Sequence, residues 1–102
     1  MRVLFSGDVA WAIGREVLAQ ALPILKQEYG AFDFTVINCE NAAHGKGMTR
    51  KIFDSFIALG VDAMTSGNHI WDKPDFYTVL NEDDRVFRPA NYNSSCPGQG
   101  HG

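Results

Sequence analysis

The sequence lacks the features of secreted, membrane-spanning and nucleic-acid-binding chains. Its only two cysteines, Cys39 and Cys96, form no C-x-x-C pair, so no disulfide framework is expected. No apolar run approaches the ~20 residues of a membrane-spanning helix, and Asp8 interrupts what could be a signal-peptide core. The formal net charge of −3 gives no electrostatic reason to expect nucleic acid or a membrane surface as a partner. We therefore expect a cytoplasmic protein without these partners.

The composition is that of an ordinary globular domain. Hydrophobic residues make up 45% and charged residues 21% of the 102 residues, with ten glycines and four prolines. These values exclude collagen-like and low-complexity classes, and no repeat or block of like charge is present. Because domains commonly contain ~100–150 residues, the chain has room for one small domain.

Short apolar runs alternate with helical periodicities along the first ninety residues. The expected strands are residues 3–5, 34–37, 63–65 and 86–87. The expected helices are about residues 14–29, 49–59 and 74–80. This alternation predicts the α/β class, with a mostly parallel sheet, flanking helices and right-handed crossovers. The run at residues 34–37 is continuously apolar, which is typical of a sheet covered on both faces.

Individual residues indicate where these helices begin and end. Pro23 lies inside the first helical pattern and predicts a kink or an early break, since proline removes a hydrogen-bond donor. Gly30 is expected as its left-handed cap. Thr49 is the expected N-cap of the second helix and Gly60 its stop. Pro74 suits the first position of the third helix.

The composition changes in the last twelve residues of the sequence. Residues 91–102 are rich in Asn, Ser, Pro and Gly and show no apolar periodicity. We interpret residues 1–90 as the α/β portion and residues 91–102 as a loop or tail. Three or four parallel strands make half of a typical α/β sandwich and expose an edge that invites association. The chain is therefore a fragment, a partner-dependent half or an unusually small domain, and we expect self-association or marginal stability.

Polar side chains follow each of the first three expected strands. Asp8 follows the first strand, Glu40 and Asn41 follow the second, and Asn68 and His69 follow the third. Because ligands gather at the carboxyl ends of strands in open α/β sheets, these groups are expected to converge on one site. Carboxylate and amide oxygens with an imidazole suit manganese, iron or magnesium.

Each of these residues also has a plain structural interpretation. Asp8 alone is more often a cap than a catalytic group, and the segment at Glu40 and Asn41 alone could be a polar loop. Asn68 is suited to a left-handed turn position, and His69 alone is more often structural. Their occurrence after three consecutive strands favours the joint site. Cys39 adjoins this cluster but is expected to point to the opposite face as a small buried side chain.

The motifs that contain these residues resemble the calcineurin-like metallophosphoesterases, and within them the YmdB-like bacterial phosphodiesterase branch. They are Phe-Ser-Gly-Asp at residues 5–8, Asn-Cys-Glu-Asn-Ala-Ala-His-Gly-Lys-Gly at 38–47 and Ser-Gly-Asn-His-Ile-Trp-Asp-Lys at 66–73. Residues 88–92 and 97–100 fit the same branch in order and spacing. The Gly-Asn-His motif alone indicates only the superfamily, and the combination is far more specific. The resemblance implies the N-terminal half of an α/β/β/α sandwich.

The resemblance also implies roles for individual residues. Asp8 would ligate one metal, Glu40 would bridge two metals in place of the usual aspartate, and Asn68 would ligate the second. Asn41 would be a further ligand or a phosphate contact. His69 would be catalytic, either as a proton donor or as a stabiliser of charge beside the leaving-group oxygen.

The implied cofactors are two divalent metal ions in a binuclear centre, iron or manganese, with magnesium or zinc as alternatives. The implied reaction is phosphodiester hydrolysis, with a hydroxide held by the cations attacking phosphorus. The implied substrate is a small phosphoester, notably a 2′,3′-cyclic nucleotide.

The chain departs from the family pattern in length and in histidine content. Family members are longer, and their C-terminal half supplies further metal-binding histidines. This sequence has three histidines, namely His44, His69 and His101. We expect His44 to line the substrate-binding pocket, whereas His101 lies in the tail at a place that matches no family ligand. The expected partners are therefore a complementing C-terminal half or further copies of the chain.

Two other functions stay open at this point. The first is a non-catalytic module that binds a nucleotide or a metal and acts through a partner. The second is a Rossmann-like nucleotide-binding domain. The turn after the first strand argues against the latter, since residues 6–14 lack the close glycine spacing that admits a pyrophosphate.

Overall fold

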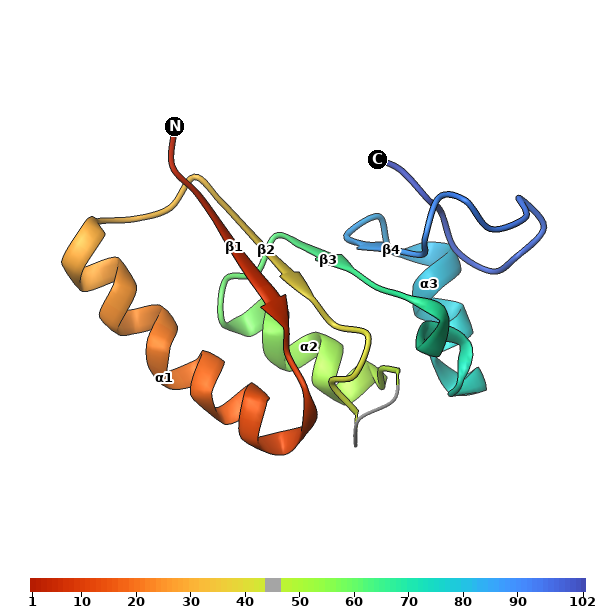
Figure 1. Ribbon diagram of the computed structural model, residues 1–102, viewed down its shortest axis with the longest axis horizontal. Helices are drawn as coiled ribbons and strands as arrows, with labels where there is room; N and C mark the ends of the chain where they lie inside the picture. The colour runs from red at the N-terminus through yellow and green to blue at the C-terminus, as the bar shows by residue number, and fades with distance from the viewer. Residues whose placement is uncertain (44–46) are drawn as a thin grey trace.

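The computed structural model describes residues 1–43 and 47–102, which form one parallel sheet with helices (Figure 1). The strands are β1 (Val3–Asp8), β2 (Phe34–Asn38), β3 (Ala63–Thr65) and β4 (Val86–Phe87). The α-helices are α1 (Trp11–Tyr29), α2 (Arg50–Ala58) and α3 (Tyr77–Glu82). Two 3₁₀ helices, η1 (Asn68–Trp71) and η2 (Pro74–Phe76), lie between β3 and α3. The predicted α/β class with a parallel sheet is confirmed.

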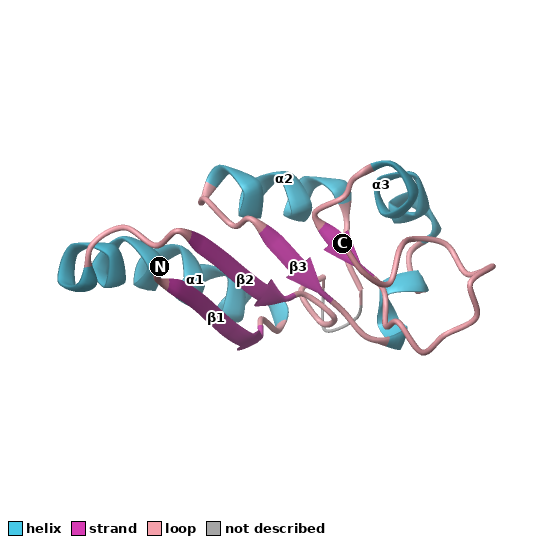
Figure 2. Ribbon diagram, turned by 90° about the horizontal axis from the view of Figure 1, so that it is seen from above, coloured by secondary structure: helices cyan, strands magenta, loops and turns pink. Residues whose placement is uncertain are grey.

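The strands stand in the sheet in the same order as in the chain, β1-β2-β3-β4. Each crossover therefore moves in the same direction, and crossovers of one hand place their helices on one face of the sheet. Figure 2 shows α2 and α3 on the same side of β3. Side chains from three strands are fully buried on this helix-covered face, namely Ile37, Met64 and Val86.

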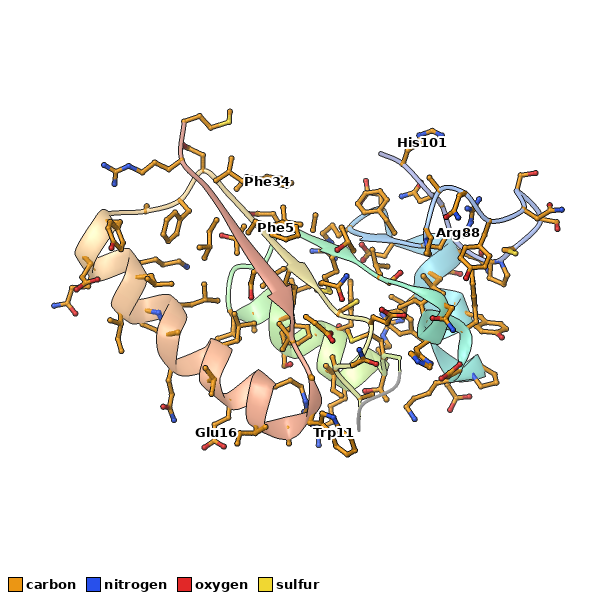
Figure 3. All side chains as sticks on the ribbon, in the orientation of Figure 1. Phe5, Trp11, Glu16, Phe34, Arg88 and His101 are labelled. Atoms are coloured by element: carbon orange, nitrogen blue, oxygen red, sulfur yellow. The ribbon has the colours of Figure 1, made fainter. Side chains whose placement is uncertain are left out.

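The opposite face of the sheet is open. Val3, Phe5 and Phe34 belong to this open face and are 56%, 64% and 43% exposed. In Figure 3, Phe5 and Phe34 lie on neighbouring strands near the top of the sheet. The apolar sequence predicts a sheet covered on both faces, but the described residues supply helices to only one.

Helix α1 differs from its prediction at both Trp11 and Pro23. It begins at Trp11, three residues before the predicted Gly14, although no side chain caps its first turn. Of the two outcomes predicted at Pro23, a kink or an early break, the early break is not observed, because one helix continues to the predicted end at Tyr29. Pro23 is exposed, so water can satisfy the carbonyl that proline leaves without a partner. Gly30 ends the helix at φ 82°, a positive value that favours glycine, although its ψ of 179° is extended.

The other helix boundaries agree more closely with the sequence. The hydroxyl of Thr49 accepts a hydrogen bond from the Ile52 backbone at 3.2 Å and caps α2 as predicted. Gly60 follows the end of α2 at φ 95°. The third predicted helix begins at Pro74, but as the 3₁₀ helix η2 that continues into α3.

Residues 91–102 contain no helix or strand, and their one β-bridge in the structure joins Gln99 to Phe87. Hydrogen bonds nevertheless attach this segment to the sheet portion. The Trp71 indole donates to the Pro97 carbonyl at 3.0 Å, and the Gly98 amide donates to Asn81 at 2.9 Å. Arg88 donates to the Gly98 carbonyl at 3.1 Å. Among the described residues, no helix is both long and apolar enough to cross a membrane.

Candidate active site at the carboxyl edge of the sheet

The turns that follow β1 and β2 are joined by hydrogen bonds. The Asn41 side-chain amide donates to an oxygen of the Asp8 carboxylate at 2.7 Å. The backbone amide of Val9 donates to the Asn38 carbonyl, and that of Trp11 donates to the Asn41 carbonyl, both at 3.0 Å. The structure therefore brings Asp8 and Asn41, which are 33 residues apart, into direct contact at the carboxyl edge.

Trp11 has an unusual backbone conformation beside this contact. Its φ of 63° is positive, and no other non-glycine residue in the described part of the chain shares this property. Such a conformation costs about 1–3 kcal/mol and is often found at functional sites. Trp11 is 57% exposed and projects at the lower edge of the molecule in Figure 3. Sequence reasoning missed this strain because the residue type gives no signal for it.

Glu40 connects the end of β2 to the turn that follows β3. Its backbone amide donates to the Asn38 side chain at 3.1 Å. Its carboxylate lies directly against the α-carbon of Gly67, where an added β-carbon would overlap both carboxylate oxygens. Gly67 is thus required as glycine by the close approach of this side chain. The next residue is Asn68, so Glu40 and Asn68 come from adjacent strand ends to neighbouring positions.

Gly47 holds the loop after β2 against the turn after β3. Its amide donates to the Glu40 carbonyl at 2.6 Å, and its carbonyl accepts from the Ala43 amide at 2.9 Å. Gly47 has φ 69°, and an added β-carbon would lie 2.5 Å from the His69 carbonyl oxygen. The loop that carries Glu40 therefore packs closely on the segment that carries His69.

His69 occupies the second position of η1 and is half-exposed. Its Nδ1 lies 2.8 Å from an oxygen of the Asp72 carboxylate. Asp72 is three residues further along the chain and was not among the site residues predicted from the sequence. The i, i+3 spacing of a short helix is the signal that could have found it.

Cys39 lies next to Glu40 but belongs to the buried core. Its side chain is fully buried, and this burial raises the pKa of the Cys39 thiol to about 12. The thiol therefore stays protonated and uncharged at neutral pH. The interpretation of Cys39 as a small buried side chain is confirmed.

The two remaining histidines lie elsewhere. His44 falls in residues 44–46, outside the described residues, so its substrate-binding role stays a prediction. His101 is exposed and helps to line a hollow of about 670 Å³ beside Phe87 and Arg88. Figure 3 shows His101 at the upper end of the molecule and Trp11 at the lower end.

The donor groups at the carboxyl edge fit part of a metal site. Asp8 and Glu40 offer carboxylate oxygens, and Asn41 and Asn68 offer amide oxygens, which are ligands for hard divalent cations. Asn41 directs its nitrogen at Asp8, which leaves its oxygen for another partner. In the part of the chain that the structure describes, no three His, Cys, Asp or Glu side chains group closely enough to hold a metal. The donor chemistry suits the cations, and a complete site needs further ligands.

These features define an α/β protein whose turns at the carboxyl edge of a parallel sheet carry oxygen donors. Residues 4–102 match the YmdB-like protein family, and the chain belongs to this family. The expected resemblance to this branch is confirmed.

Relatives with descriptive names match nearly the whole chain. A 2′,3′-cyclic-nucleotide 2′-phosphodiesterase of Bacillus subtilis is 47% identical over 100 residues, which are 98% of this chain and 38% of the relative. A putative phosphatase/phosphodiesterase of Mycoplasma pneumoniae is 38% identical over 96 residues, 93% of this chain and 34% of the relative. The chain thus spans little more than a third of the length of these relatives.

Two crystal structures share the fold. That of a hypothetical protein from Thermus thermophilus superposes with a TM-score of 0.87 at 41% identity, covering 98% of this chain and 38% of that chain. That of a novel phosphatase from Mycoplasma pneumoniae superposes with a TM-score of 0.85 at 37% identity, covering 96% and 36%. Both are longer than this chain, in agreement with the expectation that it corresponds to one portion of a larger α/β fold.

Proposed function

We propose that this chain is the N-terminal portion of a metal-dependent phosphodiesterase. The observation that carries the proposal is the contact network at the carboxyl edge. Asn41 holds the carboxylate of Asp8, and the carboxylate of Glu40 rests on Gly67 beside Asn68. These two contacts support a ligand site at the carboxyl ends of the strands, where open α/β sheets bind their ligands.

Asp8, Glu40 and Asn68 are the residues that would hold two divalent cations, with Asn41 as a further ligand or a phosphate contact. Iron or manganese suits this donor set, and magnesium and zinc are the alternatives. When bound, the cations supply Lewis-acid chemistry, because they polarise a phosphoryl oxygen and make a bound water more acidic. The ligands that this chain does not provide would come from the portion that its longer relatives possess.

The protein groups around this position have separate tasks. Asn41 fixes the orientation of the Asp8 carboxylate through its 2.7 Å hydrogen bond. Gly67 leaves the space that the Glu40 carboxylate occupies. His69 directs Nδ1 at Asp72, so Nε2 is the ring nitrogen available to the leaving-group oxygen. There it would donate a proton or stabilise developing negative charge.

The proposed substrates are small phosphodiesters, and specifically 2′,3′-cyclic nucleotides. The name of the Bacillus subtilis relative, 47% identical to this chain, supports this substrate class. A cyclic diester keeps its leaving group attached to the ribose, so opening the ring requires a proton for one ribose oxygen. A group in the position of His69 meets that requirement.

The test is hydrolysis of bis(p-nitrophenyl) phosphate and of 2′,3′-cyclic AMP with added Mn²⁺. The Asp8→Asn and Asn68→Ala variants are expected to lose at least about a hundredfold in rate, as is usual for essential polar groups in catalysis. Asp54→Asn, an exposed position on α2, is the matched control and should keep the rate. Hydrolysis that survives Asp8→Asn, or that a chelator leaves unchanged, would contradict the proposal.

A non-catalytic module that binds a metal or a nucleotide is the second candidate. It is favoured by the incomplete ligand set of the described residues. Chelator-sensitive binding of 2′,3′-cyclic AMP without turnover would favour this candidate. Nucleotide binding that is indifferent to chelator would instead favour the Rossmann-like alternative.

A further inference from the structure

His69 and Asp72 are joined by two hydrogen bonds in the 3₁₀ helix η1 and its C-cap. The ring Nδ1 of His69 lies 2.8 Å from the Asp72 carboxylate, and the Asp72 amide donates to the His69 carbonyl at 3.0 Å. In a 3₁₀ helix, side chains three residues apart eclipse one another, because each turn takes three residues. The helix type therefore places this carboxylate directly against this imidazole.

The surrounding structure holds this short helix in place. Ile70, between the two residues, is fully buried in the core. The hydroxyl of Tyr77 donates to the Trp71 carbonyl at 3.0 Å, at the end of the same turn. On the other side, the α-carbon of Gly47 approaches the His69 carbonyl so closely that no β-carbon would fit. The backbone that carries His69 and Asp72 thus belongs to a packed turn, while their side chains are 36% and 37% exposed.

We propose that Asp72 is the positioning residue for His69. Its carboxylate accepts the Nδ1 proton and leaves Nε2 as the nitrogen that meets the substrate. The assignment of a chemical task to Nε2 rests on the proposed function, whereas the contact with Asp72 does not. Asp72 touches no reacting atom and acts through the imidazole.

The proton balance shows why this orientation matters. As the oxygen of an attacking water bonds to phosphorus, the bond from phosphorus to the leaving oxygen breaks. Its electron pair stays on the leaving oxygen, which takes the proton from Nε2 of the ring protonated on both nitrogens. The neutral imidazole that results carries its one remaining proton on Nδ1. That is the proton which the Asp72 carboxylate accepts at 2.8 Å, so of the two neutral tautomers Asp72 favours the one that proton donation from Nε2 leaves.

The direct test reads the position of the proton on the ring without using activity. Nitrogen-15 NMR of the 102-residue chain, at about pH 9 and so well above the usual histidine pKa, distinguishes a proton on Nδ1 from one on Nε2. His69→Gln assigns the signals among the three histidines. We expect Nδ1–H in the wild type and a shift toward Nε2–H in Asp72→Ala. Asp75→Ala, an exposed aspartate in the neighbouring η2, should leave Nδ1–H in place.

Two outcomes of this measurement would overturn the proposal: a proton on Nε2 in the wild type, or an unchanged ring in Asp72→Ala. Where hydrolysis is measurable, a second comparison separates positioning from structural damage. Asp72→Ala should slow an alkyl phosphodiester at least about tenfold more than an aryl one, because a poor leaving group depends more on proton donation. An equal loss for both substrates would also contradict the proposal. Absence of hydrolysis in the wild type would count against the proposed function, and the NMR result would still decide the role of Asp72.

Discussion

The two faces of the sheet carry similar side chains but differ in burial. On the helix-covered face Ile37 and Met64 are fully buried, whereas on the open face Phe5 is 64% and Val3 56% exposed. Parallel sheets are usually covered on both faces, so the apolar side chains of the open face are of the kind that packs against a second layer. The Bacillus subtilis relative, of which this chain spans 38%, is the longer of the two chains.

Helix α1, next to the edge strand β1, also carries both buried and exposed apolar side chains. Its buried residues Leu18 and Leu22 pack in the core, but Ile13 and Val17 are 71% and 59% exposed. A hollow of about 660 Å³ lies between β1 and α1 and is lined largely by apolar side chains of both elements. The apolar side chains near β3 and α2 are thus buried in the core, whereas several of those near β1 and α1 remain exposed.

Substitutions on the two faces should therefore differ most in stability. Ile37→Ala removes a fully buried side chain and should lower the free energy of unfolding by about 2–5 kcal/mol. Phe5→Ala removes a larger side chain from the open face but should change the free energy of unfolding by less than about 1 kcal/mol. Urea unfolding of both variants measures the difference. Similar losses would mean that the open face is covered in solution, for example by self-association, which sedimentation would reveal.

Two glycines near the carboxyl edge offer a smaller and more local comparison. Gly67→Ala would place a β-carbon on the Glu40 carboxylate, whereas a β-carbon at Gly7 would meet nothing within 4 Å. Gly67→Ala should therefore displace Glu40 and lower Mn²⁺-dependent hydrolysis by about tenfold or more. Gly7→Ala should retain the wild-type rate of hydrolysis. Equal rates in both variants would show that the position of Glu40 does not matter to the site.

The smallest expected effect concerns the two cysteine thiols. Burial raises the pKa of the Cys39 thiol to about 12, so its reactive thiolate form is scarce at pH values below that. Cys96 lies in the tail segment and is only half-buried. In the folded chain a thiol reagent at neutral pH should modify Cys96 and leave Cys39 intact, as peptide mass mapping can show. Rapid modification of Cys39 would indicate that the helix-covered core opens readily.

The sequence was most informative where a local pattern decides the structure. The strand at residues 34–37 and the helix capped by Thr49 follow from side-chain type and spacing, and both are observed. Where local signals are weak, the prediction failed. The start of α1 at Trp11 has no capping side chain and lies three residues before the predicted start, whereas its end at Tyr29 is as predicted. The early break that was one of two outcomes predicted at Pro23 is not observed, because it depends on an exposure that a sequence does not state.

For the candidate site, the sequence predicted which residues belong to it but not the contacts between them. Its members could be named from their places after strands, because parallel topology brings strand ends together. The contacts between Asn41 and Asp8, and between Glu40 and Gly67, join segments about thirty residues apart in the chain and depend on exact register. The i, i+3 spacing of His69 and Asp72 is visible in the sequence, but the 3₁₀ helix η1 that turns this spacing into a contact was not predicted.

Calorimetric titration of the chain with Mn²⁺ tests the proposed cation site directly. A divalent-cation site at the carboxyl edge predicts that the wild type binds Mn²⁺ and that the double variant Asp8→Asn, Glu40→Gln does not. The exposed Asp54→Asn control should bind as the wild type does. Absence of binding in the wild type, or equal binding in the double variant, would contradict the claim.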